Sequence, residues 1–277
     1  MPPSTIIHID SHYVPRMHIY YFTEDRTFDK KHNPLSPVNV KPKGRKPYPT
    51  KSLSGICSIE DFYDKTVYSN QDSIENILAT YETYFNKKIE KLRQGIDDGV
   101  NSDVIVSYIS MMMSRSIELR NSIEDTIEEL QSGSDPKDIQ TLFILSGLDN
   151  LDGHLISDYK ASILIAPAGE EYITSDVPVI KVNNCEMINK MGIDVDFSKC
   201  KGYEKEFVYI CPLSSICCAI VYLKDSANCN SFVKDGRFYT VENINRMMSS
   251  QAIQYLFYAH KVSDECIKIF EDGIDDV

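Results

Sequence analysis

Glycine is scarce in this sequence, and its few copies are scattered. The 277 residues include 12 glycines, and none is arranged as GxGxxG, GxxxxGKS or GxxxxGKT. Those patterns let backbone amides cradle the phosphates of a nucleotide, so we expect no nucleotide cofactor. A GxSxG turn is also missing, which leaves Ser175 or Ser214, with His12 as base, without support as a nucleophilic site.

Long apolar runs and closely paired cysteines are absent as well. No segment reaches the roughly 18 consecutive apolar residues of a membrane span, and residues 1–10 hold no basic stretch followed by an apolar one. We therefore expect a cytoplasmic protein with no membrane partner. The eight cysteines form no CxxC pair, so we expect small buried hydrophobic residues in a reducing compartment, and no zinc site.

Acidic residues outnumber basic ones, but unevenly along the chain. The formal net charge of -12 disfavours a protein that coats nucleic acid indiscriminately, because such binding depends on Lys and Arg. Residues 30–51, however, hold seven Lys or Arg, five prolines and no Asp or Glu. They predict an extended basic arm, which is either a solvated loop or a nucleic-acid-binding segment with Tyr48 stacked on a base. The candidate phosphate contacts are Lys41, Lys43, Arg45 and Lys46.

Helical periodicity dominates residues 58–158. Ser58 predicts a cap for a short helical turn, and three longer helices follow: from about Ser73 to Gly95, from Ser102 to about Gln131, and from Pro136 to about Ser157. In the second of these, Arg115 falls in the interior and Arg120 on the expected solvated face.

Two glutamates flank the apolar stripe of the first long helix. Glu75 and Glu82 are seven residues apart and lie almost in line at about 100° per residue. Such side chains either reach into a cleft or face water as ordinary boundary residues, and the spacing alone leaves both interpretations open.

The pattern changes at Ala161. Short stretches rich in Ile, Val and Tyr, separated by Pro or Gly, predict a small, mostly antiparallel sheet within residues 161–240, followed by a closing helix over 242–261. We therefore expect an α+β protein with one domain over 1–277: an N-terminal segment and a bundle of three to four helices packed with the sheet.

Several short motifs together resemble the bacterial domain-of-unknown-function family 4238. The resemblance covers roughly His8 to Lys261. Its motifs are His12-Tyr13-Val14-Pro15, Tyr20-Tyr21-Phe22, Phe62-Tyr63, the helix from Ile74 to Glu82, Arg115, Thr174-Ser175-Asp176-Val177-Pro178-Val179 and Pro212-Leu213-Ser214. The family's histidine, valine-proline and helical glutamates are matched. The chain departs after the arginine, where Ser116-Ile117 replaces a small residue and proline. The resemblance implies candidate positions and no reaction.

The candidate catalytic residues come from four segments. They are His12, Glu75, Glu82, Arg115 and Asp176. If the fold gathers them, they make the residue set of a metal-assisted phosphodiesterase or nuclease acting on RNA or DNA. Glu75 and Asp176 would hold Mg²⁺ or Mn²⁺, the metal would activate water, and Arg115 would stabilise the charge on phosphate.

A non-enzymatic alternative explains the same residues. In an interaction or sensing protein with a protein partner, His12, Glu75 and Asp176 would form a buried polar network that specifies the fold without chemistry. A toxin or phage-defence role follows only from the bacterial setting of the resembled family. The deciding observation is whether the residues converge in an accessible cleft or are buried and fully hydrogen-bonded.

Overall fold

The computed structural model describes residues 10–30, 33–60, 62–63, 74–96, 99–130, 133–149, 158–183, 207–224 and 239–273. Helices and antiparallel sheets share these parts of the chain, which confirms the α+β class. One continuous cluster of buried apolar side chains joins residues of strands β2, β8 and β9 with residues of helices α2, α3 and α8, whose bounds follow below. No helix in the described part of the chain is long and apolar enough to cross a membrane.

The larger sheet is antiparallel throughout, as expected. Its strand order is β5-β9-β8-β7, with bounds Tyr159–Ile165, Cys217–Leu223, Phe207–Ser214 and Ile180–Asn183. Residues Cys217–Tyr222 of β9 are all buried, because neighbouring strands flank β9 and helix α3 packs on β5. The described cysteines are free and buried, as predicted for small apolar side chains.

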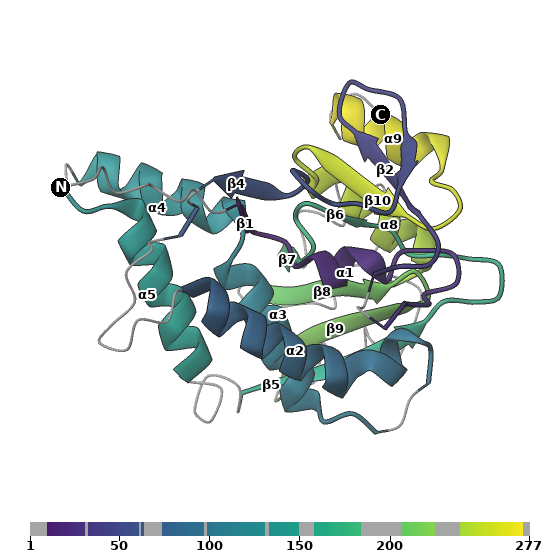
Figure 1. The fold of residues 1–277 in the computed structure, drawn as a ribbon, viewed down its shortest axis with the longest axis horizontal. Coiled ribbons are helices and arrows are strands. Elements are labelled where there is room, and N and C mark those ends of the chain that lie inside the picture. Colours follow the sequence, from purple (N-terminus) through teal and green to yellow (C-terminus); the bar gives the residue numbers. More distant parts are fainter. Residues whose placement is uncertain are drawn as a thin grey trace, which may run out of the picture.

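A second sheet has the order β3-β2-β10-β6, with bounds Tyr48–Thr50, Val38–Pro42, Tyr255–Tyr258 and Thr174–Ser175. The expected basic arm is therefore part of this sheet and not an extended appendage. The alternation that places Val38 and Val40 in the core was hidden among the lysines and prolines. Figure 1 shows β2 and β10 beside the C-terminal helices.

A short two-stranded sheet joins the N-terminal segment to the expected helical turn. Strand β1 (Asp10–His12) pairs with β4 (Ser58–Glu60), and helix α1 (Arg16–Tyr20) follows β1 after Pro15. The predicted helical turn at Ser58 is wrong, since backbone pairing with β1 extends these residues.

Helix α2 (Ile74–Arg93) confirms the first long helix, and its stripe of Leu78, Phe85 and Ile89 is buried. The second predicted helix is instead two helices, α3 (Ser102–Ser114) and α4 (Ile117–Glu129), because Ser116 accepts the amide of Leu119 and starts a new helix.

The third predicted helix begins at its expected cap. Helix α5 spans Pro136–Asp149, and residues 150–157 of the predicted helix lie outside the described residues.

The prediction that Arg120 lies on a solvated helix face is wrong. Its side chain is buried, donates to Gln140 Oε1 over 2.7 Å and to the carbonyl of Phe62, and lies over the Phe62 ring. The guanidinium of Arg120 is therefore hydrogen-bonded within the protein and not to solvent, as the pattern had predicted for a surface residue.

The closing helix predicted over 242–261 is helical only in its first part, and a strand follows within the predicted range. Helix α8 (Val241–Gln251) ends where Ala252 leaves helical geometry, and strand β10 then pairs with β2 and β6 before helix α9 (Asp264–Asp272). Backbone pairing of the apolar run Tyr255–Tyr258 with distant strands overrides its local helical spacing.

Candidate functional site

Arg115 is the centre of the cluster that the sequence predicted. Its guanidinium is almost fully buried, donates to Glu82 Oε1 and to the backbone carbonyl of His12, and donates to the Tyr63 hydroxyl over 3.3 Å. Burial would lower the pKa of Arg115, but Tyr63 and Glu82 raise it above its ordinary value. The donors that would stabilise a phosphate are directed at partners within the protein.

Glu75 lies on the same helix as Glu82 and faces the same cluster. Burial raises the pKa of its carboxyl group, against the opposing effects of a hydrogen bond from Ser11 and the charge of Arg115. Its Oε1 is buried and has no hydrogen-bond partner among the residues that the structure describes. Glu75 is therefore more readily protonated than an ordinary surface glutamate.

His12 reaches the cluster through its backbone. The imidazole itself is half-buried, and its Nε2 lies 3.4 Å from the carbonyl oxygen of Leu53. Burial lowers the pKa of His12, and the charges of Arg16 and Arg115 add to that effect. The side chain is thus neutral at pH 7.

Asp176 has a different set of partners. Its two carboxylate oxygens accept the backbone amides of Ile253 and Gln254 over 2.9 and 2.7 Å, at the start of β10. Burial raises its pKa to about 6, although these amides favour the charged form. The structure thus brings His12, Glu75, Glu82 and Arg115 together, whereas the carboxylate of Asp176 binds the turn between α8 and β10.

The four candidate phosphate contacts differ in their surroundings. Lys41 is buried, pairs with Glu271 and donates to the carbonyl of Pro42 over 3.1 Å, whereas Lys43, Arg45 and Lys46 are exposed in the turn between β2 and β3. As for metal ligands, no group of three or more His, Cys, Asp or Glu side chains in the described ranges is arranged to hold an ion.

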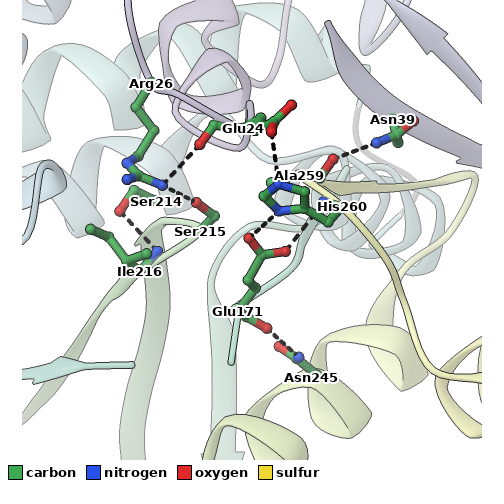
Figure 2. A network of polar contacts seen from close by, with 10 residues as sticks. All are labelled: Glu24, Arg26, Asn39, Glu171, Ser214, Ser215, Ile216, Asn245, Ala259 and His260. Atoms are coloured by element: carbon green, nitrogen blue, oxygen red, sulfur yellow. Dashed lines mark hydrogen bonds and ion pairs between the residues drawn. The ribbon is translucent and has the colours of Figure 1, made fainter. Parts of the chain in front are cut away.

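A pocket with a volume of about 840 Å³ lies elsewhere on the molecule, where segments from both halves of the chain meet. Its lining includes His260, two residues after the end of β10, and Glu171, which precedes β6. Figure 2 shows these two side chains facing each other, with Glu24 on the other side of the imidazole. No sequence motif marked this pocket.

The imidazole of His260 is held between two carboxylates. Its Nδ1 lies 2.5 Å from Glu171 Oε1, and its Nε2 lies 3.4 Å from Glu24 Oε1. Since an ionised carboxylate only accepts hydrogen bonds, Nδ1 carries a proton and Nε2 is the atom that gains or loses one. The hydrogen bond that His260 donates to Glu171 and the negative charges of Glu171 and Glu24 raise the pKa of His260. Its side chain remains 51% exposed and so accessible from the pocket.

The backbone of Glu171 is held by helix α8, and its carboxylate is held by the backbone of His260. Asn245 donates from Nδ2 to the Glu171 carbonyl over 2.8 Å and accepts the amide of Ile173 at Oδ1 over 3.0 Å. The backbone amide of His260 also donates to Glu171 Oε2 over 3.2 Å. The carboxylate is therefore oriented before any ligand enters.

Arg26 brings a guanidinium to the same pocket. It donates from Nη1 to Ser215 Oγ over 3.0 Å and to the Glu24 carbonyl over 3.4 Å (Figure 2). Its backbone has φ of +51°, a left-handed conformation that costs a non-glycine residue of order 1 kcal/mol. Such strain persists where surrounding contacts enforce it, and it is concentrated at functional sites.

The sequence contained little that could have revealed this pocket. His260 fell near the end of a predicted helix and Glu171 at the start of a predicted strand. The one local signal is the turn composition of Pro167-Ala168-Gly169, which predicts that Glu170 and Glu171 emerge from a loop.

Comparison with known proteins gives one match. The family model described as "Protein of unknown function (DUF4238)" matches residues 11–144, which confirms the resemblance over that part of the chain. The search of curated proteins and the search of solved structures find no match. Glu24 and Arg26 lie within the matched residues, and Glu171 and His260 lie beyond them.

Proposed function

We propose from the geometry that the protein is a hydrolase that uses acid–base catalysis in the His260 pocket. The family model that matches residues 11–144 describes a protein of unknown function and gives no reaction. The observation that carries the proposal is the His260–Glu171 pair, an imidazole oriented by a carboxylate and exposed to a cavity of about 840 Å³. An accessible cavity with convergent polar groups and a perturbed titratable residue is the arrangement expected of an active site.

The proposed proton transfers follow from this pair. In this step water takes the place of Glu24 at Nε2, 3.4 Å away, and neutral His260 accepts a proton from that water as it attacks the substrate. Glu171 stabilises the resulting imidazolium through Nδ1–H. The same Nε2–H then returns the proton to the leaving group. Arg26 has guanidinium donors besides Nη1, and these would bind a substrate oxygen on which negative charge develops.

The charge of the pocket restricts the substrate. Four glutamates line it (Glu24, Glu170, Glu171 and Glu242), against the cations Arg26 and Lys261 and the titratable His260. A polyanion would meet net repulsion in this lining. We therefore propose a small polar substrate that is neutral or positively charged.

The metal-assisted phosphodiesterase remains a separate prediction from the sequence. It would need free donors on Arg115, whose three contacts with Glu82, Tyr63 and His12 support the alternative of a buried polar network. The pocket adds no support for it, because the lining is acidic.

The test compares hydrolysis of three chromogenic substrates: p-nitrophenyl acetate, an amino-acid p-nitroanilide and bis-p-nitrophenyl phosphate. We expect turnover of a neutral or cationic substrate, and a loss of at least about 100-fold in kcat in His260→Ala, the usual effect of removing an acid–base group. Glu171→Gln should lose less. Glu128→Gln, an exposed glutamate on α4, is the matched control and should retain wild-type activity.

Two outcomes would overturn the proposal. One is hydrolysis that persists unchanged in His260→Ala, and the other is no turnover of any of the three substrates. Cleavage of the phosphodiester alone, abolished by a chelator, would favour the phosphodiesterase prediction instead.

A further inference from the structure

The turn between β2 and β3 is a compact basic surface on an acidic protein. Residues 43–47 read Lys-Gly-Arg-Lys-Pro and are all exposed, whereas the whole chain has a formal net charge of -12. Arg45 and Lys46 have no ion pair with another residue in the described part of the chain. We call Lys43, Arg45, Lys46 and the adjacent Tyr48 the hairpin surface.

The backbone of this turn is held at three places. The Lys43 amide donates to the Gln254 carbonyl over 2.9 Å, the Gly44 amide to Glu271 Oε2 over 2.8 Å, and the Arg45 amide to the Pro42 carbonyl over 3.2 Å. Gly44 has φ of +68°, which the turn requires and which glycine adopts without strain. The cations therefore project from a fixed scaffold, so that binding costs less ordering than it would from a flexible arm.

Glu271 is bound mainly to residues outside the exposed cations. Its carboxylate accepts from the buried Lys41 and the Gly44 amide. Burial opposes ionisation of Glu271, but these contacts and the charge of Lys43 lower its pKa. Lys41 was a predicted phosphate contact, but it is buried and its ammonium group is paired with Glu271. It is therefore not part of the hairpin surface. Lys43 lies 5.6 Å from the centre of the Phe270 ring and stays exposed above it.

An aromatic side chain stands beside these cations. Tyr48 is 42% exposed on the edge strand β3, one residue after the turn. The half-buried Tyr255 of β10 interacts electrostatically with both Tyr48 and Arg45. Exposed aromatic rings next to Lys and Arg are the elements with which proteins bind single strands, because a base stacks on the ring while phosphates meet the cations.

We propose that the hairpin surface binds single-stranded nucleic acid, with phosphates on Lys43, Arg45 and Lys46 and a base on Tyr48. The surface lies at the start of β10, beside Gln254, whereas His260 follows the end of that strand. The hairpin surface is therefore separate from the His260 pocket, and its function does not depend on the proposed hydrolysis.

The small number of cations sets the expected strength. Three phosphate contacts give a slope near -2 for the logarithm of the binding constant against the logarithm of salt concentration, at about 0.7 per contact for single strands. Binding should then weaken by about 20-fold between 50 and 200 mM salt. Affinity should not depend strongly on base sequence, because every base can stack.

The experiment measures fluorescence anisotropy of labelled dT15 and U15 with the full chain at 50 to 200 mM salt. Lys43→Ala/Arg45→Ala/Lys46→Ala should weaken binding at least 10-fold and flatten the slope. Tyr48→Ala should weaken it at least 5-fold without changing the slope, since a stacked base contributes about 1–3 kcal/mol. The charge-matched control, Lys87→Ala/Lys88→Ala/Lys224→Ala, removes three exposed lysines elsewhere and should bind within about 2-fold of wild type.

Three results would overturn the proposal: no binding at 50 mM salt, equal losses in the hairpin and control variants, or no loss in either hairpin variant. Vesicles containing 30% phosphatidylserine provide a further arm. Binding to vesicles in the absence of oligonucleotide binding would assign the hairpin surface to a membrane and reject the nucleic acid. Circular dichroism of each variant separates lost binding from lost folding.

Discussion

Removing the carboxylate of Glu82 should destabilise the fold far more than its position on a helix surface suggests. Arg115 is 1% exposed and Glu82 is 23% exposed, so Glu82→Ala leaves a guanidinium buried without its anionic partner. Breaking a buried pair from one side typically costs 3–5 kcal/mol. Because Glu82 is partly hydrated and Tyr63 and the His12 carbonyl remain as acceptors, we expect the low end, about 3 kcal/mol.

Thermal and urea unfolding both measure this loss. For a chain of this size, about 3 kcal/mol corresponds to a fall in Tm of about 6–12 °C. Glu82→Gln keeps an acceptor oxygen and should lose about half as much. The exposed Glu90→Ala on the same helix is the control and should stay within about 0.5 kcal/mol of wild type. The double variant Glu82→Leu/Arg115→Met should recover most of the stability, because it removes both charges.

Two results would refute the interpretation of Arg115 as the centre of a buried network. A change below about 0.5 kcal/mol in Glu82→Ala would mean that the pair contributes little to stability. If Glu82→Gln has normal stability but loses catalytic activity, the cluster around Arg115 would again be a candidate active site.

Three further predictions concern the pocket and its surroundings. Glu171→Gln should lower the pKa of His260 in an NMR titration, because Glu171 supplies the main interactions that raise it; an unchanged titration would show that the pair does not form in solution. Asp176 has a pKa of about 6 in the folded protein against 3.8 ordinarily, so its contribution to stability is full below pH 4 and is lost as the pH rises from 4 through 6, by at most about 3 kcal/mol. Urea unfolding from pH 4 to 7 should show this slope in wild type and lose it in Asp176→Asn, and parallel curves would contradict the assignment. Gly95→Ala should cost about 1–2 kcal/mol by thermal unfolding, because Gly95 has φ of +80° and the added methyl would lie 2.9 Å from Ile216 Cδ1 at the pocket wall; a neutral result would mean that Ile216 moves aside without cost.

The sequence predicted those helices and strands that are determined by the spacing of residues within one segment. Helix α2 was predicted because Leu78, Phe85 and Ile89 recur at helical spacing and form its buried stripe. The break at Arg115 was missed because the apolar residues on both sides keep helical spacing, which hid the capping residue Ser116. The interruption accompanies contacts with Glu82 and Tyr63, which lie 33 and 52 residues away. Strand β10 was missed for the same reason, since its pairing partners are distant.

Only some of the residues in the two candidate sites could be predicted from the sequence. Residue type and the family resemblance gave His12, Glu82 and Arg115 only as candidate positions, and it is the structure that brings them together. Asp176 has separate partners just before β10. The lining of the His260 pocket comes from six separate segments of the chain. Each polar residue in that lining is ordinary in its own local context, so periodicity and spacing gave no signal.

The position of β10 between β2 and β6 has a consequence for synthesis of the chain. Tyr255 pairs with Pro42, more than 200 residues earlier. At about 5–20 residues per second, translation leaves the β2 edge without its partner for about 10–40 s after the hairpin has emerged. Val38 and Val40 belong to the core of the finished protein, and an unpaired strand edge is prone to pair with other chains. The nascent protein should therefore depend on chaperones during elongation, and a chain truncated before residue 255 should aggregate.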